Sequence, residues 1–346
     1  MLKTVLFCQN PYAFGILEPI MMVLKEKGFP FLWFVKEPLL KIFPFSEELV
    51  TSDMNVVKSF RSDAIFVPGN EVPYYLRGLK VQVFHGLAGE KKGHFRIRHY
   101  FDLYLTQGPY FTKKFLQLKK RYKNFEVLET GWPKLDVYGK YFEKYNSEKQ
   151  DLLKKYRAEK IVLYAPTFSP SLTSASYLID EFKELAKDGE YLILVKFHDL
   201  MATELIKVYQ ELSINFENIV YEEERNIIKF LLIADCMVSD TSSVVYEFLL
   251  LDKPVITFRS NSKSIRWENT TIYKNLRSLV DSNLREDEFK SEREKINAEY
   301  HPYTDGNSAL RMVDTTLRYI AGNGVPESRK LSFMRRRKIH KIFGKY

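Results

Sequence analysis

The chain has 346 residues, enough for two α/β domains, and its 45% hydrophobic and 28% charged residues are typical of a folded globular protein. It carries 53 Lys and Arg against 44 Asp and Glu, a net charge of +9, and eight of the basic residues lie in residues 328–346, which contain no acidic residue. The remainder carries only 9 − 8 = +1, which argues against a nucleic-acid partner, since such proteins spread positive charge over the folded surface.

Short apolar runs rich in Val, Ile and Phe alternate with segments of helical spacing as far as about residue 258, which predicts repeated βαβ units and parallel sheets. In the first half the expected strands are residues 4–8, 31–35, 64–67, 81–84, 103–106 and 126–129. Helical spacing fills most of the gaps between them. This half is therefore predicted to be a doubly wound, Rossmann-like α/β domain.

A polar, charged segment at residues 139–160 precedes a second series of the same kind. Its expected strands are residues 161–165, 191–196, 218–221, 236–239 and 254–258, and its expected helices are 178–187, 227–233, 286–299 and 307–320. We expect an acceptor-binding domain at 1–150, a donor-binding domain at 151–325 and a basic tail at 326–346. If the two Rossmann-like domains face one another, the carboxyl ends of both sheets meet at a central cleft, where ligands of such folds bind.

The first candidate site is the end of the strand at 81–84, where His85 and Gly86 lead into a basic loop. An imidazole at a strand end titrates near neutrality, so His85 is the candidate general base that takes a proton from an attacking hydroxyl. The residues expected to bind an anionic acceptor are Gly86, Lys91, Lys92, Arg96 and Arg98. The alternative is a structural histidine followed by a solvated loop.

A second candidate site lies at the end of the strand at 191–196. Lys196 and His198 are two residues apart, so they lie on one side of an extended chain, and either can meet a donor phosphate. A strand end exposed to water remains the alternative.

Two turns rich in polar residues precede helices and are candidate phosphate sites. Helix N-termini with Ser and Thr hydroxyls bind phosphate, although ordinary helix capping explains the same residues. The first turn contains Asp240, Thr241, Ser242 and Ser243. The second contains Asp305, Gly306, Asn307 and Ser308, with Arg311 one turn into the helix.

Several motifs are absent from the sequence. There is no GxGxxG, no GxxxxGK[ST] and no DxD, and no His/Cys cluster has zinc spacing. We therefore expect no cofactor and no metal, with helix N-termini and cations meeting the phosphate charge.

The basic tail, residues 329–346, is expected to bind an anionic membrane, with a disordered tail as the alternative. The apolar residues that we expect to insert are Leu331, Met334, Ile339, Ile342 and Phe343. Only two cysteines occur, no apolar run is long enough to span a bilayer, and the first residues do not read as a secretory signal. These features predict a cytoplasmic protein, peripheral to the membrane at its cytoplasmic face.

Seven segments between residues 85 and 311 resemble, in the same order, the CDP-glycerol glycerophosphotransferase family of teichoic acid primases and polymerases. They are HG with a following lysine, FDLYLTQGPYFTKKF, GWPKLD, VLYAPTF, VKFH, SDTSSVVYEFLLLDKPVITF and DGNSALR. The resemblance implies a membrane-associated enzyme of the GT-B fold, with a histidine base matching His85 and a second functional histidine matching His198. It also implies that Ser242, Ser243 and the 305–308 turn bind the donor pyrophosphate. The sequence departs from the family at Asp199, where a proline is usual, and in the loop after His85.

These features together predict a transferase that moves glycerol phosphate, or a similar polyol phosphate, from a CDP-linked donor to a hydroxyl of an anionic cell-surface polymer or lipid-linked precursor. In this mechanism His85 removes the acceptor proton, while His198 and the Ser242–Ser243 helix end stabilise the phosphate charge. One alternative is a GT-B glycosyltransferase that uses a nucleotide sugar for capsule or lipopolysaccharide synthesis. Another is a two-Rossmann nucleotide-sugar epimerase, which needs no acceptor.

Overall fold

The computed structural model of the chain describes residues 1–87, 93–224 and 227–345, and it divides into two compact units. The first contains Met1–Lys140 and Glu299–Tyr346, and the second contains Tyr141–Ala298. Residues 299–325, expected in the second domain, thus belong to the first unit. The reason is α11 (Ser308–Asn323), which packs Ala309, Met312 and Val313 into the core of the first unit.

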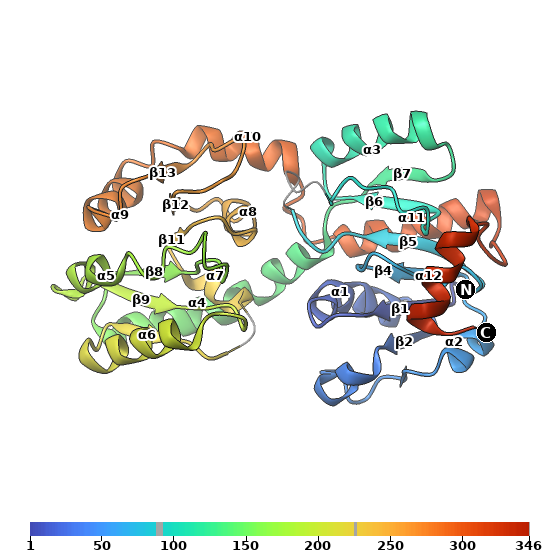
Figure 1. Cartoon of the computed structure of the whole chain (residues 1–346), viewed down its shortest axis with the longest axis horizontal. Coiled ribbons are helices and arrows are strands. Elements are labelled where there is room, and N and C mark those ends of the chain that lie inside the picture. The colour runs from blue at the N-terminus through green and yellow to red at the C-terminus, as the bar shows by residue number, and fades with distance from the viewer. Residues whose placement is uncertain (88–92, 225–226, 346) are drawn as a thin grey trace. The chain divides into compact units, whose positions relative to one another are not determined.

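The first unit is built on a seven-stranded sheet of order β3-β2-β1-β4-β5-β6-β7, in which every pair is parallel. Its strands are β1 (Thr4–Cys8), β2 (Phe31–Val35), β3 (Val50–Thr51), β4 (Ala64–Val67), β5 (Leu79–Val83), β6 (Leu103–Thr106) and β7 (Glu126–Glu129). The helices with them are α1 (Ala13–Glu26), η1 (Glu37–Ile42), α2 (Met54–Phe60), α3 (Pro109–Tyr122), η2 (Pro133–Leu135), α11 and α12 (Phe333–Phe343) (Figure 1).

Both faces of this sheet are buried, which explains why its strands read as continuous apolar runs. Successive side chains of a strand point to opposite faces. In β1, Leu6 and Cys8 belong to the cluster that α1 and α11 cover, whereas Val5 and Phe7 belong to the cluster with α2 and α12.

The second unit contains a six-stranded parallel sheet of order β10-β9-β8-β11-β12-β13. Its strands are β8 (Lys160–Tyr164), β9 (Tyr191–Val195), β10 (Ile219–Tyr221), β11 (Cys236–Ser239), β12 (Val255–Phe258) and β13 (Glu268–Thr270). Its helices are α5 (Ile179–Ala186), α6 (Thr203–Asn215), α7 (Ile228–Ile233), α8 (Val244–Leu249) and α9 (Leu276–Arg285). Two further helices, α4 (Asp136–Tyr156) and α10 (Lys290–Tyr300), each begin in one unit and end in the other.

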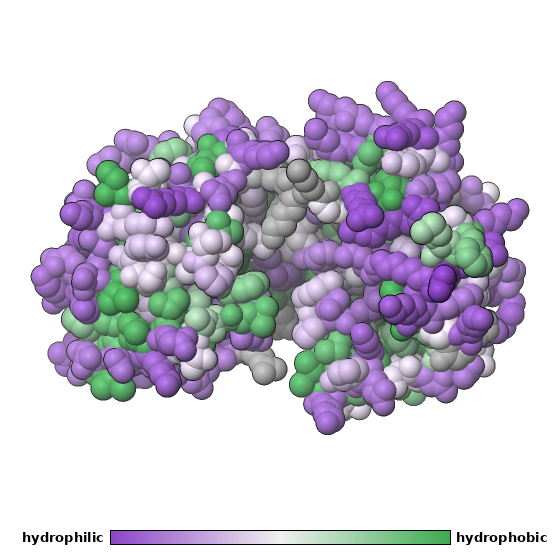
Figure 2. Space-filling model, viewed as in Figure 1, coloured by the Kyte–Doolittle hydropathy of each residue, from purple (hydrophilic) through white to green (hydrophobic). Residues whose placement is uncertain are grey.

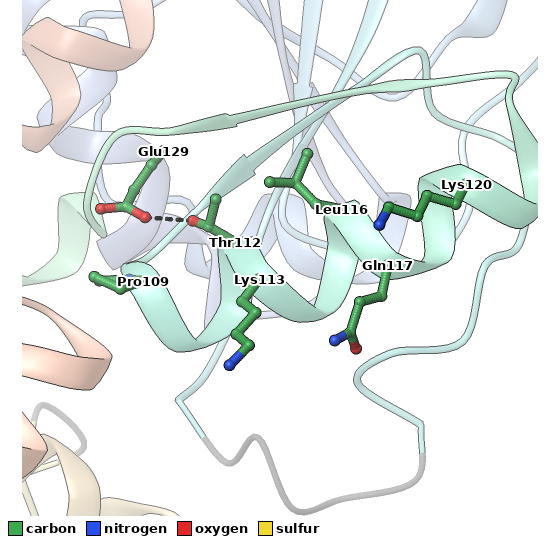
Figure 3. A pocket seen from close by; sticks show the side chains of 7 residues that line it. All are labelled: Pro109, Thr112, Lys113, Leu116, Gln117, Lys120 and Glu129. Carbon is green, nitrogen blue, oxygen red and sulfur yellow. Dashed lines mark hydrogen bonds between the residues drawn. The ribbon is translucent and has the colours of Figure 1, made fainter.

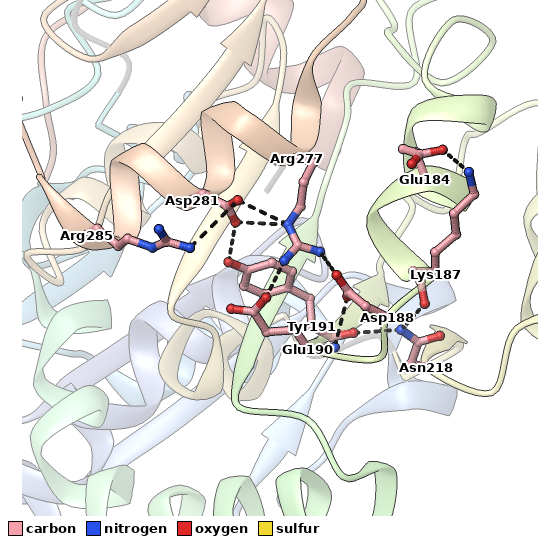
Figure 4. A network of polar contacts seen from close by, with 10 residues as sticks. Glu184, Lys187, Asp188, Glu190, Tyr191, Asn218, Arg277, Asp281 and Arg285 are labelled. Atoms are coloured by element: carbon pink, nitrogen blue, oxygen red, sulfur yellow. Dashed lines mark hydrogen bonds and ion pairs between the residues drawn. The ribbon is translucent and has the colours of Figure 1, made fainter.

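A polar network fixes α9 to the start of β9 in the second unit (Figure 4). The guanidinium of Arg277 donates to the carboxylates of Asp188, Glu190 and Asp281 and lies 4.8 Å from the centre of the Tyr191 ring. The Tyr191 hydroxyl donates to Asp281 as well, at 2.6 Å. These contacts lie at the amino end of β9, opposite to the end that His198 follows.

The C-terminal segment forms α12 and packs on the first unit. Ile339 of α12 is fully buried, the Phe343 ring lies 5.5 Å from that of Phe7, and the His340 Nε2 is 3.1 Å from the Tyr74 hydroxyl. The expected membrane-inserting set is therefore wrong for Ile339 and for Leu331, which is 9% exposed. These side chains complete a core cluster instead.

The most exposed apolar side chains of this segment are at the start of α12, where Phe333 is 79% and Met334 is 81% exposed, while Ile342 near its end is 38% exposed. Figure 2 shows a small hydrophobic spot among hydrophilic atoms over α12. None of the helices in the described part of the chain is both long and apolar enough to cross a bilayer.

Candidate active site

His85 follows β5 at the carboxyl edge of the first sheet, where its side chain is exposed. Its Nδ1 lies 2.9 Å from the carbonyl oxygen of Pro68, which follows the neighbouring strand β4. A carbonyl oxygen only accepts, so Nδ1 must carry the hydrogen and donate it. In the neutral ring Nε2 is then the unprotonated nitrogen, which is the form that a general base requires.

The backbone on both sides of His85 is held by buried side chains. The indole Nε1 of Trp132 donates to the Phe84 carbonyl at 2.6 Å, and Gln107 Nε2 donates to the Gly86 carbonyl at 3.0 Å. Trp132 and Gln107 are both fully buried, so the strand end that carries His85 is anchored from β6 and from the segment after β7. Neither residue was predicted from the sequence to have a role, although both lie in segments that carry the family resemblance.

His301 supports Trp132 in turn. The Trp132 backbone N–H donates to His301 Nε2 at 2.9 Å, so this nitrogen must be an acceptor. Burial lowers the pKa of His301 to about 4, which keeps the ring neutral at physiological pH.

The basic loop after Gly86 is described only in part. Lys91 and Lys92 lie outside the described residues. The Arg98 guanidinium donates to the Arg96 and Gly93 carbonyls at 3.2 and 3.3 Å, which closes a turn of the loop, and the Arg96 side chain is exposed.

His198 follows β9 in the second unit and is exposed, with its ring centre 4.5 Å from that of Phe168. The Leu200 backbone N–H donates to His198 Nδ1 at 3.1 Å. Nδ1 is therefore an acceptor, and the hydrogen of the neutral ring is on Nε2. His198 thus presents a donor, which is suited to a phosphate oxygen.

Lys196 does not share this exposed position. It is only 7% exposed, and its Nζ donates to the Phe197 carbonyl at 2.7 Å. Burial lowers its pKa, and the nearby carboxylates, among them Asp199 and Glu222, oppose that shift. The spacing of two residues did not bring Lys196 and His198 to one surface, because β9 ends at Val195 and His198 lies in the turn beyond it.

Asp240 has a structural role within the second unit. It is fully buried, and its carboxylate accepts the Thr167 and Ser174 backbone N–H groups, both at 2.8 Å. Burial raises its pKa to about 6, although these hydrogen bonds lower it. Asp240 therefore ties the segment after β8 to the end of β11, and the expectation that it contacts the donor is replaced by this internal contact.

The three residues that follow Asp240 lie at the start of α8. The Thr241 hydroxyl accepts the Asn261 backbone N–H at 3.0 Å, so it closes a loop. Among the described residues, Ser242 Oγ accepts a single long hydrogen bond, of 3.5 Å from Val244 N, and Ser243 is exposed. Ser242 and Ser243 remain the candidates for a phosphate contact in this turn.

The 305–308 turn belongs to the first unit, where its helix end already has an anionic partner. The Asp136 carboxylate accepts the backbone N–H groups of Ser308 and Ala309 at 2.9 and 2.6 Å. Arg311 donates to the Thr130 carbonyl at 2.8 Å and to Asp305 at 2.6 Å. Asp305, Gly306, Asn307, Ser308 and Arg311 thus belong to the first unit and not to the second domain in which they were expected, and their contact with a donor stays a prediction.

Within the described residues no group of His, Cys, Asp and Glu side chains is arranged to hold a metal ion. The candidate residues offer an unprotonated Nε2 in the neutral ring of His85, an Nε2–H in that of His198, and hydroxyls at the start of α8.

The chain is similar in sequence and in fold to several known proteins. A teichoic acid glycerol-phosphate primase from Bacillus spizizenii is 30% identical over 207 residues, which are 55% of this chain and 52% of that protein, so the chain spans about half its length. The structure of the wall teichoic acid polymerase TagF matches 92% of this chain and 89% of that chain, with a TM-score of 0.65 and 19% identity. A UDP-GlcNAc 2-epimerase from Neisseria meningitidis, bound to UDP-GlcNAc, matches 92% and 100%, with a TM-score of 0.64 and 14% identity.

At these identities the two solved structures establish the fold alone, which is of the GT-B type. The family evidence comes from the sequence. A model of the family described as CDP-glycerol:poly(glycerophosphate) glycerophosphotransferase matches residues 78–318, which include both β5 with His85 and the start of α8. The chain therefore belongs to the CDP-glycerol:poly(glycerophosphate) glycerophosphotransferase family of enzymes.

Proposed function

We propose that this protein transfers glycerol phosphate, or a similar polyol phosphate, from a CDP-linked donor to a hydroxyl of a cell-surface polymer or a lipid-linked precursor. Membership of the family supports the donor and the transferred group. The observation that carries the proposal is the hydrogen bond between His85 Nδ1 and the Pro68 carbonyl, because it makes Nε2 the basic nitrogen at the carboxyl edge of the sheet.

In the proposed reaction, His85 Nε2 takes the proton of the acceptor hydroxyl as its oxygen attacks the β-phosphorus of the donor. A new P–O bond forms, the bond from the β-phosphorus to the bridging oxygen breaks, and CMP leaves with that oxygen. His85 acts from the first unit, to which we assign the acceptor, together with Gly86, Arg96 and Arg98.

We assign the donor to the second unit. The His198 Nε2–H donates to a phosphate oxygen, and the Ser242 and Ser243 hydroxyls with the start of α8 do the same. Donors fixed in place before the reaction stabilise charge that develops on the phosphates and the leaving group. Lys196 and Asp240 are left out of this set, because both are buried in contacts within the unit.

We also propose that the start of α12 brings the protein to an anionic membrane, where lipid-linked acceptors lie. Phe333 and Met334 are exposed, and three arginines follow them directly, Arg335, Arg336 and Arg337. Exposed apolar side chains beside cations bind anionic lipid surfaces.

The function is tested by incubating the purified chain with CDP-glycerol and a lipid-linked acceptor and measuring CMP release. UDP-sugars and CMP-sugars in place of CDP-glycerol distinguish a glycosyltransferase, and omission of the acceptor distinguishes an epimerase, which turns over its donor alone. We expect CMP release from CDP-glycerol that depends on the acceptor. A second measurement, calorimetry with CDP, is expected to show weaker binding to the Ser242→Ala/Ser243→Ala protein, and unchanged affinity would exclude the start of α8 as the donor site.

A further inference from the structure

The helix α3 begins at the same edge of the sheet as His85. It starts one residue after Gly108, and the preceding Gln107 contacts the Gly86 carbonyl beside His85. Because β6 ends at the carboxyl edge, α3 runs back along the unit and away from His85. Its 14 residues extend for about 20 Å at about 1.5 Å per residue.

α3 is strongly basic. It contains five cations and no acidic residue, and Lys123 follows directly at its C-terminal end. Lys119 is paired with Glu126 in β7. By contrast, the exposed Lys113 and Lys120 form no ion pair and no hydrogen bond with any residue in the described ranges.

A hollow of about 540 Å³ lies along this helix, and Lys113 and Lys120 line it (Figure 3). With Gln117 they occupy positions i, i+4 and i+7, so the three side chains come from successive turns on one face. The two ammonium groups stand on flexible stems whose backbone positions are about 10 Å apart along the axis. Two separate phosphates of one chain can therefore contact them together.

The acidic residue of the hollow is already engaged. Glu129 accepts hydrogen bonds from the Tyr303 hydroxyl, at 2.7 Å, and from the Thr112 hydroxyl (Figure 3). Both contacts lie near the start of α3, at the end of the hollow away from Lys120. These hydroxyl donors leave the Glu129 carboxylate charged, but neither Lys113 nor Lys120 forms an ion pair with it in the described ranges.

The surface of α3 suits a polyanion better than a lipid bilayer. Phe111 and Phe115 are buried in the core, and Leu116, 42% exposed, is the large apolar side chain that α3 exposes. Figure 2 shows a mostly hydrophilic surface over this helix. Insertion into lipid requires several exposed apolar groups, which the start of α12 has and α3 lacks.

We propose that α3 binds the phosphodiester chain of the acceptor polymer behind the terminal hydroxyl that reacts at His85. This inference rests on the proposed function and specifies its acceptor as a polyanion that already carries several polyol-phosphate units. Lys113 and Lys120 bind its phosphates, and Gln117 lies between them as a neutral hydrogen-bonding group. An acceptor with one polyol-phosphate unit does not reach Lys113 and Lys120, so these lysines favour elongation over the first addition.

The test compares the wild type with Lys113→Gln/Lys120→Gln. The matched control is Lys58→Gln/Lys207→Gln, which removes two exposed lysines on α2 and α6 that likewise have no partner in the described ranges. In the CMP-release assay, the α3 variant is expected to raise KM for an acceptor with many units about three- to tenfold, with little change in kcat. KM for an acceptor with one unit is expected to stay the same, and the control is expected to behave as wild type.

A binding measurement separates this inference from the proposed function. Fluorescence anisotropy with labelled inorganic polyphosphate needs no turnover, and the α3 variant is expected to bind more weakly, with a smaller dependence on salt. Equal polyphosphate affinity in the wild type and the α3 variant overturns the inference, whatever the enzyme assay shows. If the variant instead loses binding to anionic phospholipid vesicles while polyphosphate affinity is unchanged, α3 is a membrane surface and the inference is also wrong.

Discussion

Replacement of Asp136 tests the structural role of the 305–308 turn. We expect Asp136→Ala to lower the free energy of unfolding of the first unit, because two backbone N–H groups at the start of α11 lose a half-buried, charged acceptor. Hydrogen bonds to charged groups contribute about 1.5–3 kcal/mol each, and the two are not fully additive, so the expected loss is about 3 kcal/mol. Asp136→Asn keeps one oxygen as an acceptor and is expected to cost about half as much.

The assay is urea unfolding combined with hydrogen exchange of peptides from residues 305–323. The matched control is Asp53→Ala, because Asp53 caps α2 with one exposed hydrogen bond, 2.8 Å from Asn55 N, and its loss is expected to cost about 1 kcal/mol. Exchange in residues 305–323 is expected to increase in the Asp136 variants and to be unchanged in the control. If Asp136→Ala is no more harmful than Asp53→Ala, and exchange at 305–323 stays slow, the carboxylate is not the cap and the turn is again available for phosphate.

Three further predictions concern catalysis, pH and the membrane. His85→Ala is expected to lower turnover by about 10² to 10⁴ with little change in CDP affinity, whereas His198→Ala is expected to weaken CDP binding as well. If a folded His85→Ala enzyme keeps more than about a tenth of wild-type turnover, the mechanism is wrong. Because the pKa of His301 is lowered in the folded protein, the unfolded chain binds the proton first as the pH falls. The free energy of unfolding is therefore expected to decrease as the pH falls from about 6.5 to about 4. Urea unfolding is expected to show a smaller decrease in His301→Gln. Phe333→Ser/Met334→Ser is expected to reduce sedimentation with anionic liposomes, and equal sedimentation of both proteins counts against α12 as the contact.

The sequence was sufficient for the strands that lie inside the sheets. A parallel strand covered on both faces needs apolar side chains at every position, so it produces a run that a linear pattern detects. Each strand predicted in this way is present, with ends that differ by at most two residues. The strands missed are β3 and β13, of two and three residues at the sheet edges, where burial does not demand an apolar run.

The sequence was not sufficient for the unit boundary or for the 305–308 turn. The apolar stripe of α11 fits a helix of either domain, and only the folded structure shows that it packs against α1. The turn was correctly read as the start of a helix, but its partner, Asp136, is 172 residues away from Ser308. A local pattern indicates that backbone N–H groups need an acceptor, and it does not distinguish a ligand phosphate from a distant carboxylate of the same chain.

The two candidate catalytic histidines show why residue type alone does not assign chemistry. His85 and His198 each follow a parallel strand, and their rings differ in the backbone group that meets Nδ1, a carbonyl oxygen for His85 and an N–H for His198. That difference puts the hydrogen of the neutral ring on opposite nitrogens, so Nε2 is unprotonated in His85 and carries the hydrogen in His198. The carbonyl belongs to Pro68, the residue after a neighbouring strand, and the N–H belongs to Leu200, two residues along the same turn. The strand order decides the first contact and the turn geometry decides the second, so the position of the hydrogen on each ring follows from the fold rather than from the motif.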